Sequence, residues 1–250
     1  MSDDSYITFQ LFEKFEELIY AFSTRRGGYS KGLFSSLNMG NIKYDDLTTV
    51  MKNRRLFYKK LGIVENAVAL PDQIHSANVE IVSSTGIISK TDALVTSTRG
   101  LFLGVQTADC FPVFLYVPEK QIIGIVHAGW KGAVQNILTK TINIMVENLG
   151  VLPTELYVAI GPGLQKECFE IRSDVFEQFP EKFLDFHPDA LKRYLNLSGY
   201  LKQQLISLKI PPEQIYVSRD CTKCNHEKFF SYRRDGEKSG RMMGIIGIRP

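Results

Sequence analysis

The 250-residue chain lacks any apolar run near the ~20 residues that a membrane-spanning helix needs. Its first residues, MSDDSYITFQ, also lack the basic segment and apolar core that mark a secretory signal. The chain also lacks a large excess of positive charge, because 30 Lys and Arg are balanced by 27 Asp and Glu and no long basic block occurs. We therefore expect a cytoplasmic protein with neither a membrane nor a nucleic acid as its partner.

Cysteine is equally scarce, with only Cys110, Cys168, Cys221 and Cys224 in the chain. A chain of this length buries enough apolar surface to fold without disulfides. In a reducing compartment the four thiols are therefore expected to be core side chains, metal ligands or nucleophiles.

Short apolar runs alternate with helical patterns, and neither a repeat nor a proline-rich linker interrupts them. Helically spaced apolar residues predict helices over 48–62, 132–150 and 198–210, the last capped by Ser198. Runs that are apolar on consecutive residues indicate strands covered on both faces, at 79–82, 93–95, 101–106, 112–117, 121–126, 155–161 and 214–218. Residues 23–41 and 221–241 are expected to form ordered loops. The pattern predicts an α/β (α+β) fold with mixed sheets, as a single domain over 1–250.

The stretch QTADCFPVFLY at 106–116 places Cys110 at the mouth of a predicted strand, and His127 follows the next one. The turn-like PEK between the two strands predicts an antiparallel hairpin. If the turn centres near Glu119 and Lys120, Pro112 lies opposite His127 and Cys110 is its diagonal neighbour, about 7 to 8 Å away at the backbone. The two side chains can then converge on one ion or one proton.

Three roles suit this pair. A thiolate and an imidazole are good zinc ligands, with His75 as the preferred third ligand and an open fourth position for catalysis. Alternatively, Cys110 is a nucleophile and His127 its base. In the third reading both residues are ordinary buried side chains.

A second cysteine pattern, Cys221 and Cys224 with His226 close behind, has the CxxC spacing of a structural metal site. A fourth partner is not evident, although Cys168 is available, and the alternative is ordinary packing or a pocket wall. The stretch FFSYRRDG that follows is a candidate substrate-side loop, with Arg233 and Arg234 available for ion pairs.

Five stretches together resemble the laccase-domain family, once called multicopper polyphenol oxidases: STRRGGYSKGLFSSLNMG, TADCFPVFLY, VHAGWKGAV, AIGPGLQKECFEI and FFSYRRDGEKSGR. They run in the family's order from about residue 20 to the C-terminus. The family's members are described as purine nucleoside phosphorylases with adenosine deaminase side activity. The resemblance implies a layered α/β/β/α fold with mixed sheets, zinc held by His75, Cys110 and His127, and purine nucleosides and phosphate as substrates. Four histidines are too few for the copper clusters of a laccase.

Further residues carry over by motif. The resemblance makes Arg25 the first choice for binding phosphate, and Lys131 stands where relatives usually have arginine. Asn38 and Gln73 are implied as substrate contacts, and Asp109 as a catalytic acid or base or as an orienting group. Because adjacent residues on a strand point in opposite directions, an active role for Asp109 requires a bend there.

Two rival functions remain open at this point. One is a cysteine-type amide hydrolase, acting on peptidoglycan precursors, in which Cys110 attacks and His127 shuttles the proton. The other is a zinc-stabilised binding protein without turnover. An N2S donor set also accepts divalent metals other than zinc.

Overall fold

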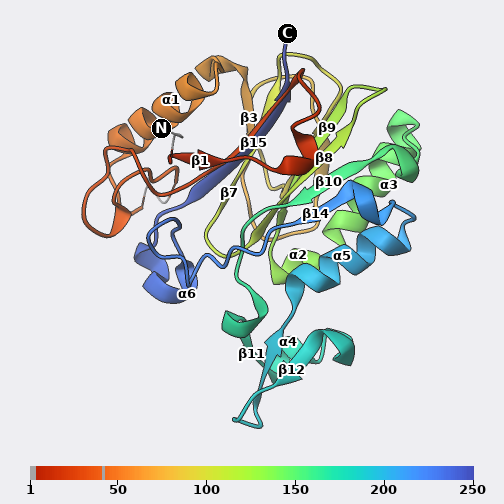
Figure 1. Ribbon diagram of the computed structural model, residues 1–250. Helices are drawn as coiled ribbons and strands as arrows, with labels where there is room; N and C mark the ends of the chain where they lie inside the picture. The colour runs from red at the N-terminus through yellow and green to blue at the C-terminus, as the bar shows by residue number, and fades with distance from the viewer. Residues whose placement is uncertain (1–3, 41–42) are drawn as a thin grey trace.

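A computed structural model of the chain describes residues 4–40 and 43–250, and two six-stranded sheets form its centre (Figure 1). Sheet A has the order β1-β2-β15-β7-β3-β5. Its strands are β1 (Tyr6–Ile7), β2 (Leu18–Ser23), β15 (Met242–Ile248), β7 (Phe102–Thr107), β3 (Val68–Pro71) and β5 (Gly86–Ile88). Parallel and antiparallel pairs both occur, so the sheet is mixed, as predicted.

Sheet B has the order β14-β10-β8-β9-β6-β4 and is also mixed. Its strands are β14 (Ile215–Val217), β10 (Tyr157–Ile160), β8 (Phe111–Val117), β9 (Ile122–Ala128), β6 (Ala93–Thr96) and β4 (Val79–Ile81). Each strand predicted from the sequence corresponds to an observed strand, with ends shifted by one or two residues.

The described residues form six α-helices. They are α1 (Leu47–Lys60), α2 (Trp130–Val134), α3 (Ile137–Leu149), α4 (Ser173–Phe176), α5 (Leu197–Ser207) and α6 (Tyr232–Asp235). One apolar cluster joins α1 to sheet A, a second lies between the sheets, and a third joins sheet B to α3 and α5. This is the predicted α/β/β/α layering. No helix in the described part of the chain has both the length and the apolar character needed to cross a membrane.

A third, small sheet projects from the layered body beside α4 (Figure 1). Its order is β11-β13-β12, formed by β11 (Glu170–Arg172), β13 (Lys192–Leu195) and β12 (Leu184–Phe186). Phe169, Ile171 and Leu195 belong to the same apolar cluster as sheet B and α3. The projecting sheet is thus packed onto the main body by its apolar side.

The β8–β9 hairpin has the predicted register. Pro112 lies opposite His127, and the turn closes through a bond from the Gln121 amide to the Pro118 carbonyl. All seven residues of each strand are buried, because sheet A covers one face and helices the other. The open end of the hairpin carries Cys110 and His127 side by side.

Two helix predictions need correction. Residues 132–150 form α2 and α3 rather than one helix, because Asn136 between them adopts a left-handed conformation with φ of 61°. The predicted cap Ser198 lies inside the first turn of α5, whereas the side chain of Asn196 accepts the capping hydrogen bond from the Gly199 amide. Residues 24–40 are mainly loop as expected, and residue 41 lies outside the described residues. The predicted loop 221–241 is interrupted by the short helix α6 and by the 3-10 helix Gly236–Lys238.

Candidate metal centre and substrate cavity

Three side chains from separate segments converge at the open end of the hairpin. His75 lies in the loop after β3, Cys110 directly before β8, and His127 near the end of β9. A ligand atom of each lies within 4.8 Å of the others, and the two imidazole rings meet edge to face with centroids 4.8 Å apart. This group of two nitrogens and one sulfur is a candidate metal site.

The backbone at the site is shaped to present these groups. His75 has a φ of 61° and Asp109 a φ of 93°, both in the left-handed region. The turn at Asp109 is the bend that an inward-facing Asp109 requires. Gly129, just after β9, lets the segments approach closely, since a Cβ there would lie 2.9 Å from the Cys110 Sγ.

Asp92, directly before β6, contacts His127 and the loop that carries His75. Its Oδ1 lies 2.8 Å from the Nδ1 of His127, which leaves Nε2 of this ring for a metal ion. The same carboxylate accepts hydrogen bonds from the amides of His75 and Ser76, at 3.1 and 2.7 Å. One fully buried carboxylate therefore orients His127 and holds the loop that carries His75.

The electrostatics of the group favour charged forms. Burial by itself opposes ionisation of Cys110 and His127, but it is outweighed by their mutual attraction together with the contributions of His75 to Cys110 and of Asp92 to His127. The pKa of Cys110 is lowered to about 6, and the pKa of His127 is raised to about 9. Burial likewise opposes ionisation of Asp92, yet hydrogen bonds from His127 and Ser76 lower its pKa to about 2. A thiolate at neutral pH is the form in which cysteine binds metals.

The group forms part of the wall of a cavity of about 990 Å³, at the upper end of the range for small-molecule sites. Aromatic side chains of Trp130, Phe169 and Tyr232 line it. Its cationic lining residues are Arg54, Lys131, Arg233 and Arg241. The cavity thus combines ring surfaces with positive charge, which suits an aromatic ligand together with an anion.

Arg241 is a lining cation that interacts electrostatically with Cys110. Burial lowers its pKa, and the nearby charges of Cys110 and Asp109 act in the opposite direction. Its guanidinium donates to the carbonyls of Ser239 and Gly240 at 2.7 and 3.0 Å. Arg54, from α1, donates from its Nε to the Met39 carbonyl at 2.8 Å. Both arginines are therefore held in place by backbone oxygens.

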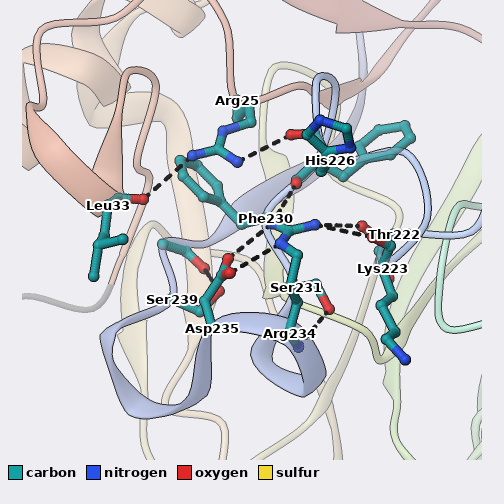
Figure 2. A network of polar contacts seen from close by, with 12 residues as sticks. Arg25, Leu33, Thr222, Lys223, His226, Phe230, Ser231, Arg234, Asp235 and Ser239 are labelled. Carbon is teal, nitrogen blue, oxygen red and sulfur yellow. Dashed lines mark hydrogen bonds and ion pairs between the residues drawn. The ribbon is translucent and has the colours of Figure 1, made fainter. Parts of the chain in front are cut away.

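Arg25 lies outside the cavity lining, in contrast to its predicted contact with phosphate. Figure 2 shows its guanidinium above the ring of Phe230, between two loops. It donates to the carbonyls of Ser35, His226 and Leu33 at 2.9, 3.0 and 3.3 Å. In this position the side chain joins the N-terminal loop to the C-terminal one, and its role at phosphate stays a prediction.

The other predicted contacts fall into two groups. Gln73 and Lys131 line the cavity, and the Gln73 amide exchanges hydrogen bonds with the backbone of Gln106. Asn38 is fully buried, and its Oδ1 accepts from the Arg241 amide at 2.9 Å, so it holds the backbone of a lining residue. Asp109 lines the cavity, and its carboxylate accepts from Thr222 Oγ1 and from the Arg233 amide, both at 2.6 Å.

Sequence reasoning did not single out Asp92, Arg54 or Arg241. Asp92 precedes a predicted strand, as a turn residue often does, so its spacing alone carries no functional signal. Arg54 sits within an amphipathic helix, where a surface arginine is the ordinary expectation. Arg241 ends a polar loop, and only the pairing of β15 with β7 brings it near Cys110.

Comparison with known proteins places these features in a family. A "Purine nucleoside phosphorylase" of Deinococcus radiodurans is 37% identical, over 92% of this chain and 88% of its own length. "Purine nucleoside phosphorylase YlmD" of Geobacillus stearothermophilus is 32% identical, over 94% of this chain and 92% of its own. The crystal structure of YlmD from that organism superposes with a TM-score of 0.91 and covers 95% of this chain and 94% of its own.

A further relative, "Adenosine deaminase RL5" from an unknown prokaryotic organism, is 30% identical over 92% of this chain and 94% of its own length. Residues 19–249 match the family described as multi-copper polyphenol oxidoreductase laccase. The match includes all three residues of the candidate metal centre and nearly the whole fold, and on this ground the chain belongs to the multi-copper polyphenol oxidoreductase laccase family.

Proposed function

We propose that this protein is a purine nucleoside phosphorylase that acts on adenosine, inosine and related nucleosides, with adenosine deaminase activity at the same site and zinc as its metal. The observation that carries the proposal is the convergence of His75, Cys110 and His127 on the wall of a cavity lined by cations and aromatic rings. The names of the relatives supply the reaction class.

The donor set fits zinc. Two imidazoles and one thiolate are typical ligands, and three protein ligands leave one position open, as catalytic zinc sites require. The carboxylate of Asp92 against His127 supplies the outer hydrogen bond that such a ligand usually makes. When bound, the ion provides Lewis acidity beside the substrate. We place the metal at His75, Cys110 and His127.

In phosphorolysis an oxygen of phosphate forms a bond to C1′ of the ribose while the bond from C1′ to N9 breaks. The electron pair of the broken bond leaves with the purine, which takes up the proton that the phosphate gives up, so the products are the free base and ribose 1-phosphate. The site must hold an anion close to a sugar that develops positive charge. We place phosphate at Arg241 and Arg54, because backbone oxygens already orient both guanidinium groups. Lys131 adds positive charge on the same cavity.

Asp109 is proposed as a positioning residue. Hydrogen bonds from Thr222 and from the Arg233 amide occupy both oxygens of its carboxylate. These bonds tie the end of the hairpin to the C-terminal loop and so fix the position of Cys110. Gln73 similarly fixes the cavity wall at Gln106.

The amide hydrolase has one observation in its favour, the low pKa of Cys110 beside His127. The same pair is explained by metal binding, and the relatives' names do not favour hydrolysis of amides. A metal-free protein with a fast-alkylating Cys110 would support the hydrolase instead. The cytoplasmic location stays a prediction from the sequence.

The proposal is tested by incubating purified protein with adenosine, with and without phosphate, beside a His75→Ala variant. We expect adenine and ribose 1-phosphate only when phosphate is present, inosine under both conditions, and loss of the zinc ion of this centre and of both activities in the variant. Elemental analysis measures the metal. Release of adenine without phosphate, or full activity without metal, would contradict the proposal.

The two arginine assignments are separated by a second pair of variants. Arg241→Gln is expected to raise the KM for phosphate about tenfold or more, because a charge-assisted bond to an anion is lost. Arg25→Gln is expected to lower the unfolding midpoint and leave this KM nearly unchanged. The opposite outcome would return the phosphate site to Arg25.

A further inference from the structure

Three of the four cysteines gather at a second place. Cys168 ends the short 3-10 helix Lys166–Cys168 that leads into β11, whereas Cys221 and Cys224 belong to the loop after β14. Their sulfur atoms all lie within 4.8 Å of one another, and those of Cys168 and Cys224 are 3.2 Å apart. In a tetrahedral zinc site with bonds of about 2.3 Å, two sulfur ligands are about 3.8 Å apart. The spacing of the three thiols is close to that requirement.

The backbone around Cys221 is arranged as a ligand loop. The backbone N–H groups of Cys224, Gln165 and Lys223 are directed at its sulfur atom. The Asn225 amide donates to the Cys221 carbonyl at 3.0 Å and closes the turn between the two cysteines of the CxxC.

The two segments that carry the cysteines are joined by hydrogen bonds beside the cluster. Cys221 pairs with Gly163 in an isolated bridge, and the Gln165 amide group donates to the carbonyls of Ser218 and Asp220, both at 3.3 Å. The arrangement of the cluster is therefore set before any ion binds.

Two arginines of α6 hold the same segments from the other side. Arg233 donates to the carbonyls of Glu170 and Cys168 at 2.8 and 3.5 Å. Arg234 donates to the carbonyls of Lys223 and Thr222 at 3.1 and 3.3 Å, as Figure 2 shows. The two guanidinium groups thus fix the backbone of Cys168 and of the loop between Cys221 and Cys224.

We propose that Cys168, Cys221 and Cys224 form a second metal site, which binds zinc and fastens the projecting sheet to the C-terminal loop. Each thiol gives up its proton as the ion binds. Cys224 is exposed, so the fourth position faces solvent and is taken by water. His226 stays outside the ligand group, with its Nε2 3.2 Å from a carboxylate oxygen of Glu227.

The site has a consequence for the cavity. Thr222, between the two loop cysteines, donates to Asp109, which precedes Cys110. Phe169, next to Cys168, lines the cavity on the opposite segment. Metal binding at the three cysteines therefore holds two parts of the cavity wall together. This inference does not depend on which reaction the cavity catalyses.

Zinc content tests the proposal. The full chain is purified from zinc-supplied cells under reducing conditions without chelator, and zinc is measured per chain. We expect about two zinc ions per chain in the wild type and about one per chain in each of the single variants Cys168→Ser and Cys224→Ser. Lys223→Ser, which changes an exposed residue of the same loop that is not a proposed ligand, should keep both ions. Cys110→Ser should lose the other ion and keep this one.

Cobalt absorption tests the site in a variant that keeps all three proposed cysteine ligands. This test therefore does not require a variant without these ligands to fold. Cys110→Ser reconstituted with Co²⁺ should show strong near-ultraviolet thiolate-to-cobalt absorption, which only the three remaining cysteines can supply. Adding Cys168→Ser and Cys224→Ser should remove about two-thirds of it or more. If the wild type contained one zinc ion and Cys110→Ser contained none, the proposal would be overturned. Peptide mapping of the protein purified under reducing conditions provides a further check. A disulfide between Cys168 and Cys224 in place of zinc would overturn the proposal as well.

Discussion

At the scale of single residues, the candidate metal centre depends most on a side chain that would not touch the metal. The side chain of Asp92 is fully buried, accepts from the amides of His75 and Ser76 and pairs with His127. A buried carboxylate with this many partners is expensive to remove, because its donors are left unsatisfied.

Asp92→Asn should therefore weaken metal binding about 10- to 100-fold, since an amide cannot accept all these bonds and does not favour the correct tautomer of His127. Chelator competition measures the affinity, and nucleoside turnover should fall in parallel. Glu80→Gln, an exposed change on β4, is the control and should alter neither quantity. An unchanged affinity in Asp92→Asn would show that the carboxylate does not orient the ligands.

Gly129 is the second residue on which the centre depends. An added Cβ would lie 2.9 Å from the Cys110 Sγ and 3.4 Å from the His75 Cδ2. Gly129→Ala should thus displace these ligands and reduce activity and metal occupancy at the His75, Cys110 and His127 centre at least tenfold, with a smaller effect on the free energy of unfolding.

The matched control for Gly129→Ala is Gly104→Ala in sheet A, where the new Cβ would meet Leu70 Cδ2 at 2.7 Å. It should lower stability and leave metal content intact. Equal loss of metal in both variants would mean that general destabilisation, rather than ligand displacement, is responsible.

At the scale of elements, a turn sets the register of the β8–β9 hairpin and a cap residue sets the start of helix α5. The turn at 118–121 sets the register of β8 against β9, and that register alone places Cys110 beside His127. Helix α5 depends on a cap that the sequence pattern misplaced by two residues, because both Asn196 and Ser198 are favourable cap residues. Packing decided between them, since Ser198 is buried in the first turn.

Asn196→Ala should lower the free energy of unfolding by about 1 kcal/mol, because the Gly199 amide loses its acceptor at 2.9 Å. Asn196→Asp should retain most of the stability, since a carboxylate also caps a helix. Urea unfolding of the two variants beside the wild type measures the difference. If Ser198→Ala proved the more harmful change, the assigned cap would be incorrect.

At the scale of the whole molecule, burial between layers raises the pKa of tyrosines that do not line the cavity. Tyr20 lies between the two sheets and Tyr58 between α1 and sheet A. Burial raises the pKa of each to about 12. Burial also raises the pKa of Tyr116, with a further contribution from its hydrogen bond to Glu17.

Alkaline pH should therefore destabilise the protein. Above pH 10 the tyrosines ionise in the unfolded chain but not in the folded one, so the stability is fully present below pH 10 and is lost as pH rises towards 12. The expected loss is about 2 to 3 kcal/mol for each of Tyr20 and Tyr58. Urea unfolding at several pH values measures it, and Tyr58→Phe should flatten the dependence. A constant free energy of unfolding over this range would contradict the burial argument.

The predicted single domain over 1–250 leads to another expectation. The apolar residues of the projecting sheet share a cluster with sheet B and α3, so the sheet should not unfold separately. Trp130, the single tryptophan, reports on the cavity, and circular dichroism reports on the helices and sheets. Both signals should follow one transition in urea. Two separated transitions would instead indicate independently folding units.

The sequence by itself determined those features that depend on neighbours along the chain. Apolar runs predicted the strands, the short turn predicted the register that pairs Pro112 with His127, and motif resemblance predicted the layered fold and the three converging side chains. These signals are readable because strand pairing across a short turn and the period of buried residues are local properties.

Only the tertiary structure decided which polar groups meet across distant segments. Asp92 reaches His75 and His127 because β6 pairs with β9, and Arg241 approaches Cys110 because β15 pairs with β7. Arg25 binds backbone carbonyls of two loops, and Cys168 meets Cys221 and Cys224 across 53 residues or more of chain. Such contacts arise from the packing of whole layers, and the free energy that brings them together comes mainly from apolar burial elsewhere. The spacing of polar residues along the sequence therefore does not predict these contacts.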